Sequence, residues 1–467
     1  MKKQIPLKAI YVVFAIAFLI RIAVPFAAYH SCHNFSKFYT SDSSSYIAPA
    51  QSIAKTLEFN NSKGEPEIVR TPGYPLLIIP GILLGHTEAV TIFFQVIISF
   101  LTILIIYKTA LELFEDFNAA FFSALLAGVS RVLIINTYKL MTETLSTAIL
   151  TLFLYYIIVY FKKKELKYII MSAIFLAVSI YVRPAAYYLP LFLIPCMLVW
   201  LLLKKELTKT IIIHLTIFIV LTSGLIMIWQ IRNKTVANYT HFSAIVDINQ
   251  YFYNAASVLA VKEGVSFLDM RNKLGFYKDI RLAVKDTDNI EFLSSGEAYN
   301  FVRKKASAII LDNPLLYTKI HIVGMFRTLI SGGIPSFSKV LNRYFWFGGI
   351  TGLIIDQGIT KTLHILSEEK KSVLIIYFLS HIGVLIYYIF VIITLLKKGI
   401  KNKEGVIILI ITAIYFLIIS GGVLGHDRFR HPMVPSICIL GGMGMAIVFK
   451  NIMEKWKSKT LKQHNIL

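Results

Sequence analysis

The chain contains 467 residues, of which 56% are hydrophobic and only 16% are charged, and its mean hydropathy is +0.66. Soluble globular proteins are typically about 45–50% apolar and about 25% charged, so this composition excludes a soluble enzyme, a disordered tail protein and a secreted disulfide scaffold. The net charge of +22 comes from basic residues in short clusters between apolar runs, a pattern that sets orientation in a membrane. We therefore expect an all-α polytopic membrane protein with no nucleic-acid partner.

Ten apolar runs are long enough to be membrane-spanning helices, which need about 20 residues. The first, near 9–28, follows Lys2, Lys3 and Lys8, and we interpret it as a retained signal anchor because it is too long for the apolar part of a signal peptide. The other predicted spans lie near 88–107, 118–135, 144–161, 168–182, 185–203, 210–230, 373–396, 405–424 and 432–450. Two ambiguous stretches, 316–335 and 344–360, would raise the number to twelve. We favour ten spans, with these stretches packed at the outer surface.

The lysine clusters predict the orientation. Placing the N-terminus, the clusters at 162–167, 204–209 and 397–404, and the tail from Lys450 in the cytoplasm satisfies the positive-inside rule. Two long segments, 29–87 and 231–372, then lie outside. No Walker A or GxGxxG motif is present. We therefore expect activity on the outer face, in a bacterial or archaeal cytoplasmic membrane.

This topology divides the chain into three parts. Residues 1–235 form a membrane module that includes the first outer loop at 29–87. Residues 236–372 form an outer region with short helices. Residues 373–467 form the last spans and a basic cytoplasmic tail. The two outer segments are unlike each other and the halves of the chain do not match, which argues weakly against a transporter built from repeats.

The first outer loop holds the richest set of polar residues. Asp42 stands directly before a stretch that can form a helix, with Tyr46 one turn later, and the loop closes with Arg70 and the turn Pro72–Pro75. The structural interpretation of Asp42 is a helix N-cap, which accepts hydrogen bonds from backbone N–H groups. The functional interpretation is a carboxylate at the membrane surface, directed at a lipid-borne substrate.

Other charged residues gather at the predicted outer ends of helices: Glu143, Arg183, Arg232, Arg428 and Arg430. Arginines on this side run against the positive-inside trend and need an anionic partner. Lipid phosphate is the obvious partner, because a guanidinium group binds phosphate through two hydrogen bonds. We expect Arg183, Arg428 and Arg430 to be the leading phosphate ligands.

A charged residue also lies inside the first predicted span. Arg21 would be costly in lipid, so we expect it to face protein or a polar cavity. Near the last span, His426, Asp427 and His431 fit no standard zinc spacing, and the three cysteines are far apart. We expect no metal site here, and the sequence leaves a dependence on divalent metal open.

The ordered set carries a family resemblance. Its members are Asp42, Tyr46, the turn Arg70-Thr71-Pro72-Gly73-Tyr74-Pro75, Glu143, Arg183-Pro184, Trp229 with Arg232-Asn233, and Arg428-Phe429-Arg430. This set resembles the GT-C superfamily of membrane glycosyltransferases, and within it the group of protein mannosyltransferases and aminoarabinose transferases (glycosyltransferase family 39-like). The resemblance implies a GT-C-like bundle of about 10–12 membrane helices, with outer loops that carry short interfacial helices.

The resemblance also implies a function. The donor would be a sugar on a polyprenyl phosphate, the acceptor a protein, lipid or glycan on the outer face, and Asp42 the general base. No cofactor is expected, because the lipid-phosphate sugar is a substrate. Aminoarabinose transferases often have an acid directly before the basic residue of this loop; here that position is Val69, which argues against an acid–cation pair there and against a lipid A acceptor. The expected substrate-binding residues are Tyr46, Arg70, Tyr74, Glu143, Arg183, Arg232, Arg428 and Arg430.

The chemistry suits these residue types. A carboxylate that takes the acceptor proton contributes typically about 10²–10⁴-fold to the rate. The departing lipid phosphate needs cations, which stabilise its growing charge. A single displacement would invert the anomeric configuration. Two alternatives are a flippase or exporter of lipid-linked sugars, which should show charges at mid-membrane depth and symmetric halves, and a polysaccharide polymerase or ligase.

Overall fold

The computed structural model describes residues 5–333, 359–367, 371–400 and 402–464. Helices make up the architecture of these residues, and the only β-type pairing in them is one isolated bridge between Asn60 and Pro66. The expectation of an all-α fold is therefore confirmed.

Among the described residues, seven helices are long and apolar enough to cross a membrane. They are α1 (Leu7–His30), α4 (Thr87–Phe114), α7 (Glu143–Lys163), η2 (Pro184–Ala186) with α9 (Leu189–Leu203), α10 (Lys209–Ala237), the segment Phe378–Leu396 of α20 (Lys371–Leu396), and η4 (Asp427–Met433) with the part of α22 (Val434–His464) up to Trp456. Shorter apolar helices are α3 (Gly73–Leu83), α5 (Phe117–Val129) and α8 (Leu166–Val182). Helix α21 (Lys403–Ile419) packs against α7, α9 and α22. Seven of the ten predicted spans fall on the long helices, and the other three, 118–135, 168–182 and 405–424, fall mainly on the shorter helices α5, α8 and α21.

The predicted span at 118–135 needs a correction, because it is not one helix. The chain leaves helical geometry at Ser130, where ψ is 113°, and a separate short helix, α6 (Arg131–Ile135), follows. The 13 residues of α5 rise about 20 Å at about 1.5 Å per residue, less than the roughly 30 Å of a bilayer core. The break carries the chain towards Glu143.

Arg21 is fully buried, as expected for a charge inside a span. Its Nε donates to Ser99 Oγ on α4 at 2.9 Å, and its Nη1 donates to the carbonyl oxygens of Ala17 and Gly128 at 3.0 Å. The guanidinium therefore faces protein and links α1 to α4 and α5.

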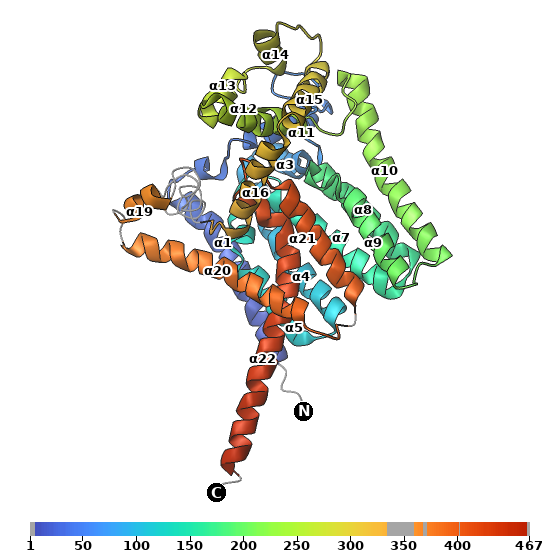
Figure 1. The fold of residues 1–467 in the computed structure, drawn as a ribbon, viewed down its shortest axis with the longest axis vertical. Helices are drawn as coiled ribbons and strands as arrows, with labels where there is room; N and C mark the ends of the chain where they lie inside the picture. The colour runs from blue at the N-terminus through green and yellow to red at the C-terminus, as the bar shows by residue number, and fades with distance from the viewer. Residues whose placement is uncertain (1–4, 334–358, 368–370, 401, 465–467) are drawn as a thin grey trace.

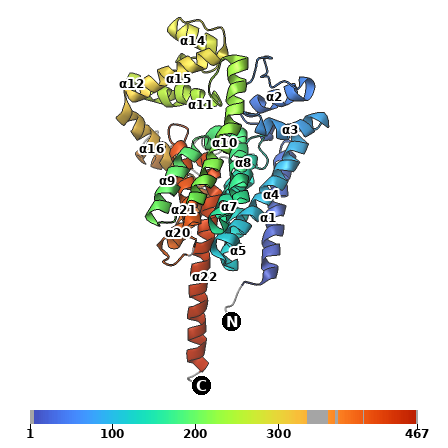
Figure 2. The ribbon, with the colours of Figure 1, turned by 90° about the vertical axis from the view of Figure 1, so that its right-hand side faces the viewer.

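A group of short helices forms a separate apolar core at one end of the molecule. It consists of α11 (Ile245–Asn249), η3 (Gln250–Ala255), α12 (Ala256–Glu263), α13 (Phe267–Lys273), α14 (Ile280–Asp288) and α15 (Ser295–Leu311). Figures 1 and 2 show this group, which we call the outer domain, at the end opposite both chain termini. Helix α2 (Ser43–Thr56) lies near the same end.

Helix α16 (Pro314–Ile330) covers most of the first ambiguous stretch. It packs against the end of α21: His321 Nε2 lies 2.7 Å from the carbonyl oxygen of Ile418. The close approach requires glycine at position 324, because a Cβ there would lie 1.9 Å from the carbonyl oxygen of Gly422. Among the described helices, α16 is not one of those long and apolar enough to span. Most of the second stretch, 344–360, lies outside the described residues; α19 (Ile359–Ser367) begins at its end.

Candidate active site

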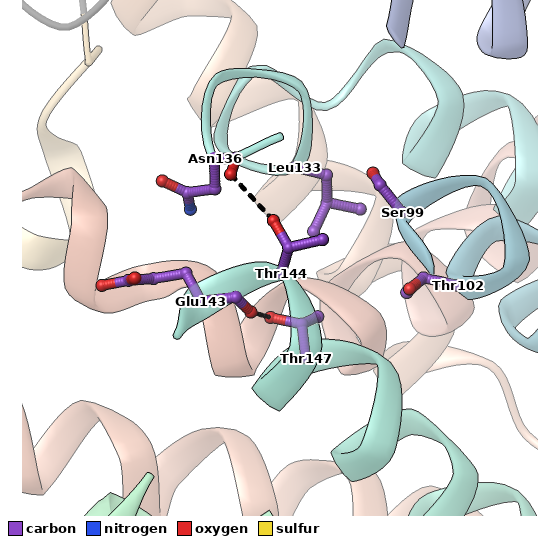
Figure 3. A pocket seen from close by; sticks show the side chains of 7 residues that line it. All are labelled: Ser99, Thr102, Leu133, Asn136, Glu143, Thr144 and Thr147. Carbon is purple, nitrogen blue, oxygen red and sulfur yellow. Dashed lines mark hydrogen bonds between the residues drawn. The ribbon is translucent and has the colours of Figure 1, made fainter. Parts of the chain in front are cut away.

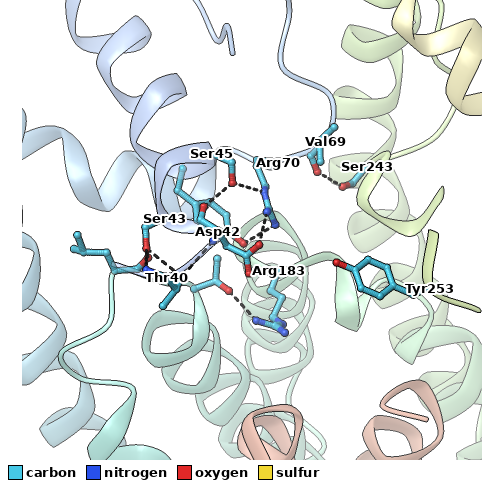
Figure 4. A network of polar contacts seen from close by, with 12 residues as sticks. Thr40, Asp42, Ser43, Ser45, Val69, Arg70, Arg183, Ser243 and Tyr253 are labelled. Carbon is cyan, nitrogen blue, oxygen red and sulfur yellow. Dashed lines mark hydrogen bonds and ion pairs between the residues drawn. The ribbon is translucent and has the colours of Figure 1, made fainter. Parts of the chain in front are cut away.

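Five charged side chains from distant parts of the chain meet beside the outer domain. Asp42 precedes α2, Arg70 closes the first outer loop, Glu143 begins α7, Arg183 follows α8, and Arg428 lies in η4 (Asp427–Met433). We call this group the arginine–carboxylate cluster. Figure 4 shows its core. The sequence named all five residues, and the fold brings them into one connected set of ion pairs.

Asp42 is at the centre of the cluster. Its Oδ1 accepts a hydrogen bond from Arg70 Nη2 at 3.0 Å, and its Oδ2 accepts one from Arg428 Nη2 at 3.1 Å. Although Asp42 occupies the N-cap position of α2, its side chain makes no capping hydrogen bond. The carboxylate is 31% exposed. The capping interpretation is therefore not supported, and the functional interpretation stays a prediction.

The Arg70 guanidinium is held in a fixed direction by α2. Its Nε donates to Ser45 Oγ at 2.9 Å and its Nη1 donates to the Tyr46 hydroxyl at 3.0 Å, while its Cζ lies 4.5 Å from the centre of the Tyr46 ring. Tyr46 thus shares the helix face that points at Asp42, as the sequence predicts.

The backbone before Arg70 is shaped by a buried acid. Glu67 Oε1 accepts hydrogen bonds from the backbone N–H groups of Val69, at 2.6 Å, and Arg70, at 2.9 Å. Glu67 is therefore committed to the loop backbone, and the carboxylate that pairs with the Arg70 side chain is Asp42. The loop also needs Gly73, because a Cβ there would lie 2.8 Å from the carbonyl oxygen of Tyr181 on α8.

Glu143 joins the other two arginines. Its side chain is fully buried, and its Oε1 accepts hydrogen bonds from Arg183 Nη1 at 2.8 Å and from Arg428 Nε. Arg183 Nη1 also donates to Thr142 Oγ1 at 3.0 Å. Arg428 therefore bridges the two carboxylates, with Nε on Glu143 and Nη2 on Asp42.

The electrostatics of Asp42 follow from this geometry. Burial alone would raise the pKa of the Asp42 carboxyl, but the positive charges of Arg70 and Arg428 outweigh burial, so its pKa lies below the usual value. Asp42 is consequently ionised at neutral pH. With both arginines in place it is also a weaker base than a free aspartate.

Four expected substrate-binding residues lie outside the cluster; Tyr46 bonds to its Arg70, and the other three bond elsewhere. The Tyr74 hydroxyl donates to Gln95 Oε1 at 2.8 Å, and its buried ring packs edge-on against Tyr46. Arg232 donates to the carbonyl oxygen of Glu67 at 2.6 Å and so ties α10 to the first outer loop. Arg430 donates to three carbonyl oxygens at the end of α16, those of Thr328, Leu329 and Ser331. A role of these three in substrate binding stays a prediction.

A small cavity borders the cluster at Glu143 and is lined by Ser99, Thr102, Leu133, Asn136, Glu143, Thr144 and Thr147 (Figure 3). Its threonine hydroxyls are committed to carbonyl oxygens: Thr144 bonds to Asn136 at 2.8 Å and Thr147 to Glu143 at 2.8 Å. The bond from Thr144 to Asn136 fixes the start of α7 beside this cavity.

Sequence reasoning missed several contributors to this region. Ser45 and Thr142 accept hydrogen bonds from Arg70 and Arg183. A single serine or threonine does not indicate such a role in one sequence. Tyr253, from the outer domain, faces the cluster in Figure 4 and was also missed. Within the described part of the chain, no group of three or more His, Cys, Asp or Glu side chains is placed to hold a metal ion.

Part of the chain is similar to a known protein family. Residues 69–229 match the family of dolichyl-phosphate-mannose-protein mannosyltransferases. This segment carries Arg70, Glu143 and Arg183. A comparison with curated protein sequences gives no match.

Several solved structures are similar to this chain at low sequence identity. The oligosaccharyltransferase AglB from Archaeoglobus fulgidus, in complex with an inhibitory peptide and a dolichol-phosphate, aligns with a TM-score of 0.53 and 14% identity, over 97% of this chain and 52% of AglB. A second structure of an oligosaccharyltransferase from this organism, tethered to an acceptor peptide, gives 0.50 and 14%, over 95% and 50%. ArnT from Cupriavidus metallidurans bound to undecaprenyl phosphate gives 0.39 and 10%, over 94% and 78%.

These findings confirm the resemblance at the level of the superfamily: the chain has a GT-C membrane fold. Residues 69–229, about a third of the chain, are similar to the protein mannosyltransferase family. The chain spans about half the length of the AglB chain.

Proposed function

We propose that the protein is a membrane glycosyltransferase that moves a sugar from a polyprenyl-phosphate donor to a hydroxyl or similar group of an acceptor on the outer face. The observation that carries this proposal is the partly exposed Asp42 carboxylate between Arg70 and Arg428. AglB, which has the same fold, is in complex with a dolichol-phosphate, a lipid of the proposed class.

The charges of the cluster suit such a donor. Arg70, Arg183 and Arg428 carry three positive charges, whereas Asp42 and Glu143 carry two negative charges. One positive charge is left over. A sugar linked to a polyprenyl monophosphate is a phosphodiester with one negative charge, so its binding would neutralise the cluster.

The proposed reaction is a single displacement. The acceptor oxygen attacks the anomeric carbon, the bond from that carbon to the phosphate oxygen breaks, and the bonding electrons stay on that oxygen. Asp42 takes the acceptor proton. Arg428 and Arg183, both anchored on Glu143, stabilise the charge that gathers on the leaving phosphate. The sugar is transferred with inversion at the anomeric carbon.

Donor binding would also activate Asp42. In the structure Arg428 bonds to Asp42 and Glu143 at once. A phosphate that recruits Arg428 Nη2 weakens its bond to Asp42. One of the charges that lower the pKa of Asp42 is then shared with the phosphate, and the carboxylate becomes a stronger base. The base is thus strengthened when the donor is in place.

A transfer assay tests the function. Purified protein is incubated with a panel of undecaprenyl-phosphate hexoses and pentoses and with peptide, lipid and glycan acceptors, and both glycosylated product and released undecaprenyl phosphate are measured. We expect one donor to give equal amounts of the two. Movement of the intact lipid-linked sugar across vesicles, with no release, would instead establish the flippase alternative.

The outer-face location has its own test. Ser62, in the first outer loop, and Thr287, on α14, are both exposed. In a cysteine-free background, Ser62→Cys and Thr287→Cys should react in intact cells with a thiol reagent that does not cross the membrane. Protection of both positions until the membrane is permeabilised would reverse the proposed orientation.

A further inference from the structure

A π-helical segment in the outer domain carries a tyrosine towards the arginine–carboxylate cluster. The segment is η3 (Gln250–Ala255), and Tyr253 lies within it. In Figure 4 the Tyr253 hydroxyl points towards the side where Asp42, Arg70 and Arg183 gather. Helical segments of this type are rare and are frequent at functional sites, where they redirect a side chain.

The position of Tyr253 relative to Asp42 is fixed by bonds between the outer domain and the first outer loop. Arg281 Nη2 on α14 donates to Glu65 Oε1 at 2.6 Å. The backbone N–H of Ala244, at the start of the outer domain, donates to the carbonyl oxygen of Ile68 at 2.9 Å. The loop that carries Arg70 and the domain that carries Tyr253 therefore form the two sides of one site.

The orientation of the Tyr253 ring is also fixed. Arg271 Nη2 donates to the Tyr253 hydroxyl oxygen at 3.2 Å, and its Cζ lies 4.4 Å from the centre of the Tyr253 ring. The same guanidinium stacks on Phe276, 3.7 Å from the ring centre. The aromatic packing and the hydrogen bond hold the hydroxyl in place before any ligand binds.

The Tyr253 hydroxyl is a hydrogen-bond donor. Burial raises its pKa above the usual value, against the opposing charge of Arg271, and the charges of Asp42 and Arg70 also reach it. The group therefore keeps its proton at neutral pH. Its oxygen already accepts from Arg271, and among the described residues we find no acceptor for its own proton.

We propose that the Tyr253 hydroxyl donates a hydrogen bond to a hydroxyl oxygen of the transferred sugar, so that Tyr253 contributes to recognition of the sugar. This inference rests on the proposed function. With its phosphate on Arg428 and its anomeric carbon beside Asp42, the donor must place its sugar ring next to the cluster, which Tyr253 faces. A tyrosine hydroxyl held in one position can donate to a sugar hydroxyl only where that hydroxyl has the right position on the ring, so it can distinguish one sugar from another.

The test compares two lipids that share the polyprenyl phosphate, of which only one carries the sugar. Affinities are measured for undecaprenyl phosphate and for the undecaprenyl-phosphate sugar that the wild-type protein uses in the transfer assay. Tyr253→Phe keeps the ring and removes the hydroxyl. We expect it to weaken binding of the sugar-bearing lipid about 2- to 10-fold, the effect of one lost hydrogen bond, and to leave binding of undecaprenyl phosphate unchanged.

A matched control is Tyr277→Phe, which removes a hydroxyl from the same domain at a side chain that is 79% exposed. It should change neither affinity. Equal affinities of wild type and Tyr253→Phe for the sugar-bearing lipid would overturn the role of Tyr253 while leaving the transferase proposal intact. A wild-type protein that releases no undecaprenyl phosphate from any donor would instead remove the proposed function itself.

Discussion

Two aspartates in this protein have similar partners and opposite surroundings. Asp247, in the outer domain, has a fully buried side chain that accepts hydrogen bonds from Arg303 Nε and from the Tyr239 hydroxyl. Asp42 also has two partners, but both are arginines and its carboxylate is 31% exposed. Burial raises the pKa of Asp247 above its usual value, whereas two positive charges lower the pKa of Asp42.

The difference separates a structural ion pair from the pair that we propose to be reactive. Asp247 is closed off from solvent, with one charge to balance one charge, so a substrate cannot reach it. The cluster around Asp42 is partly open and carries a surplus positive charge that an anion can neutralise. An acid–arginine pair alone therefore does not indicate an active site, and our proposal for Asp42 depends on its exposure and on the surplus positive charge around it.

The largest expected effect on transfer comes from Asp42→Asn. Asparagine keeps the size of the side chain and the capacity to cap a helix, but it cannot take a proton. Turnover should fall about 10²-fold or more. Affinity for undecaprenyl phosphate should be unchanged or higher, because a negative charge beside the arginines is removed. Near wild-type turnover would show that the carboxylate is not the base, and Glu143 would be the next candidate.

Arg428→Lys should have the next largest effect. A lysine keeps the charge but cannot bond to Asp42, Glu143 and a phosphate in the same planar geometry. We expect affinity for undecaprenyl phosphate to fall about 10-fold, measured by titration of the purified protein. The neighbouring substitution Arg430→Lys is the control, because Arg430 bonds to carbonyl oxygens of α16. An equal loss in both variants would place Arg430 in the phosphate site as well.

A smaller effect is expected in the pH dependence of Arg70→Gln. Because the pKa of Asp42 is lowered by Arg70 and Arg428, the wild-type carboxylate stays ionised to pH values below the usual carboxyl range. Removal of the Arg70 charge raises that pKa, so the acid limb of kcat/KM should move to higher pH. Lys63→Gln, in the same loop but exposed, should leave the limb in place. A limb that does not move in Arg70→Gln would assign it to another group.

The smallest effect on transfer is expected from Asp247→Asn. This change leaves Arg303 without its counter-ion in the outer domain, which should lower the thermal midpoint of the purified protein. Turnover per folded molecule should stay close to that of wild type. A large loss of turnover without a loss of stability would contradict the distinction between the two aspartates.

The sequence predicted the membrane helices well, because an apolar run of sufficient length has few alternatives to a buried or lipid-facing helix. It also named all five members of the arginine–carboxylate cluster. It could not assign different roles to Arg428 and Arg430, because both belong to the same short motif. Only the fold shows that Arg428 bonds to carboxylates and Arg430 to carbonyl oxygens of α16. Tyr253 depends on a local π-helix and on contacts between two outer segments, and neither leaves a pattern in one sequence.

The most direct test of the central claim is an experimental structure of the full chain with undecaprenyl phosphate bound. The account predicts that the phosphate oxygens accept hydrogen bonds from Arg428 and Arg183, and that Arg428 Nη2 has left Asp42, whose carboxylate then faces the bound lipid. A phosphate bound elsewhere, with the Asp42–Arg428 pair intact, would contradict it.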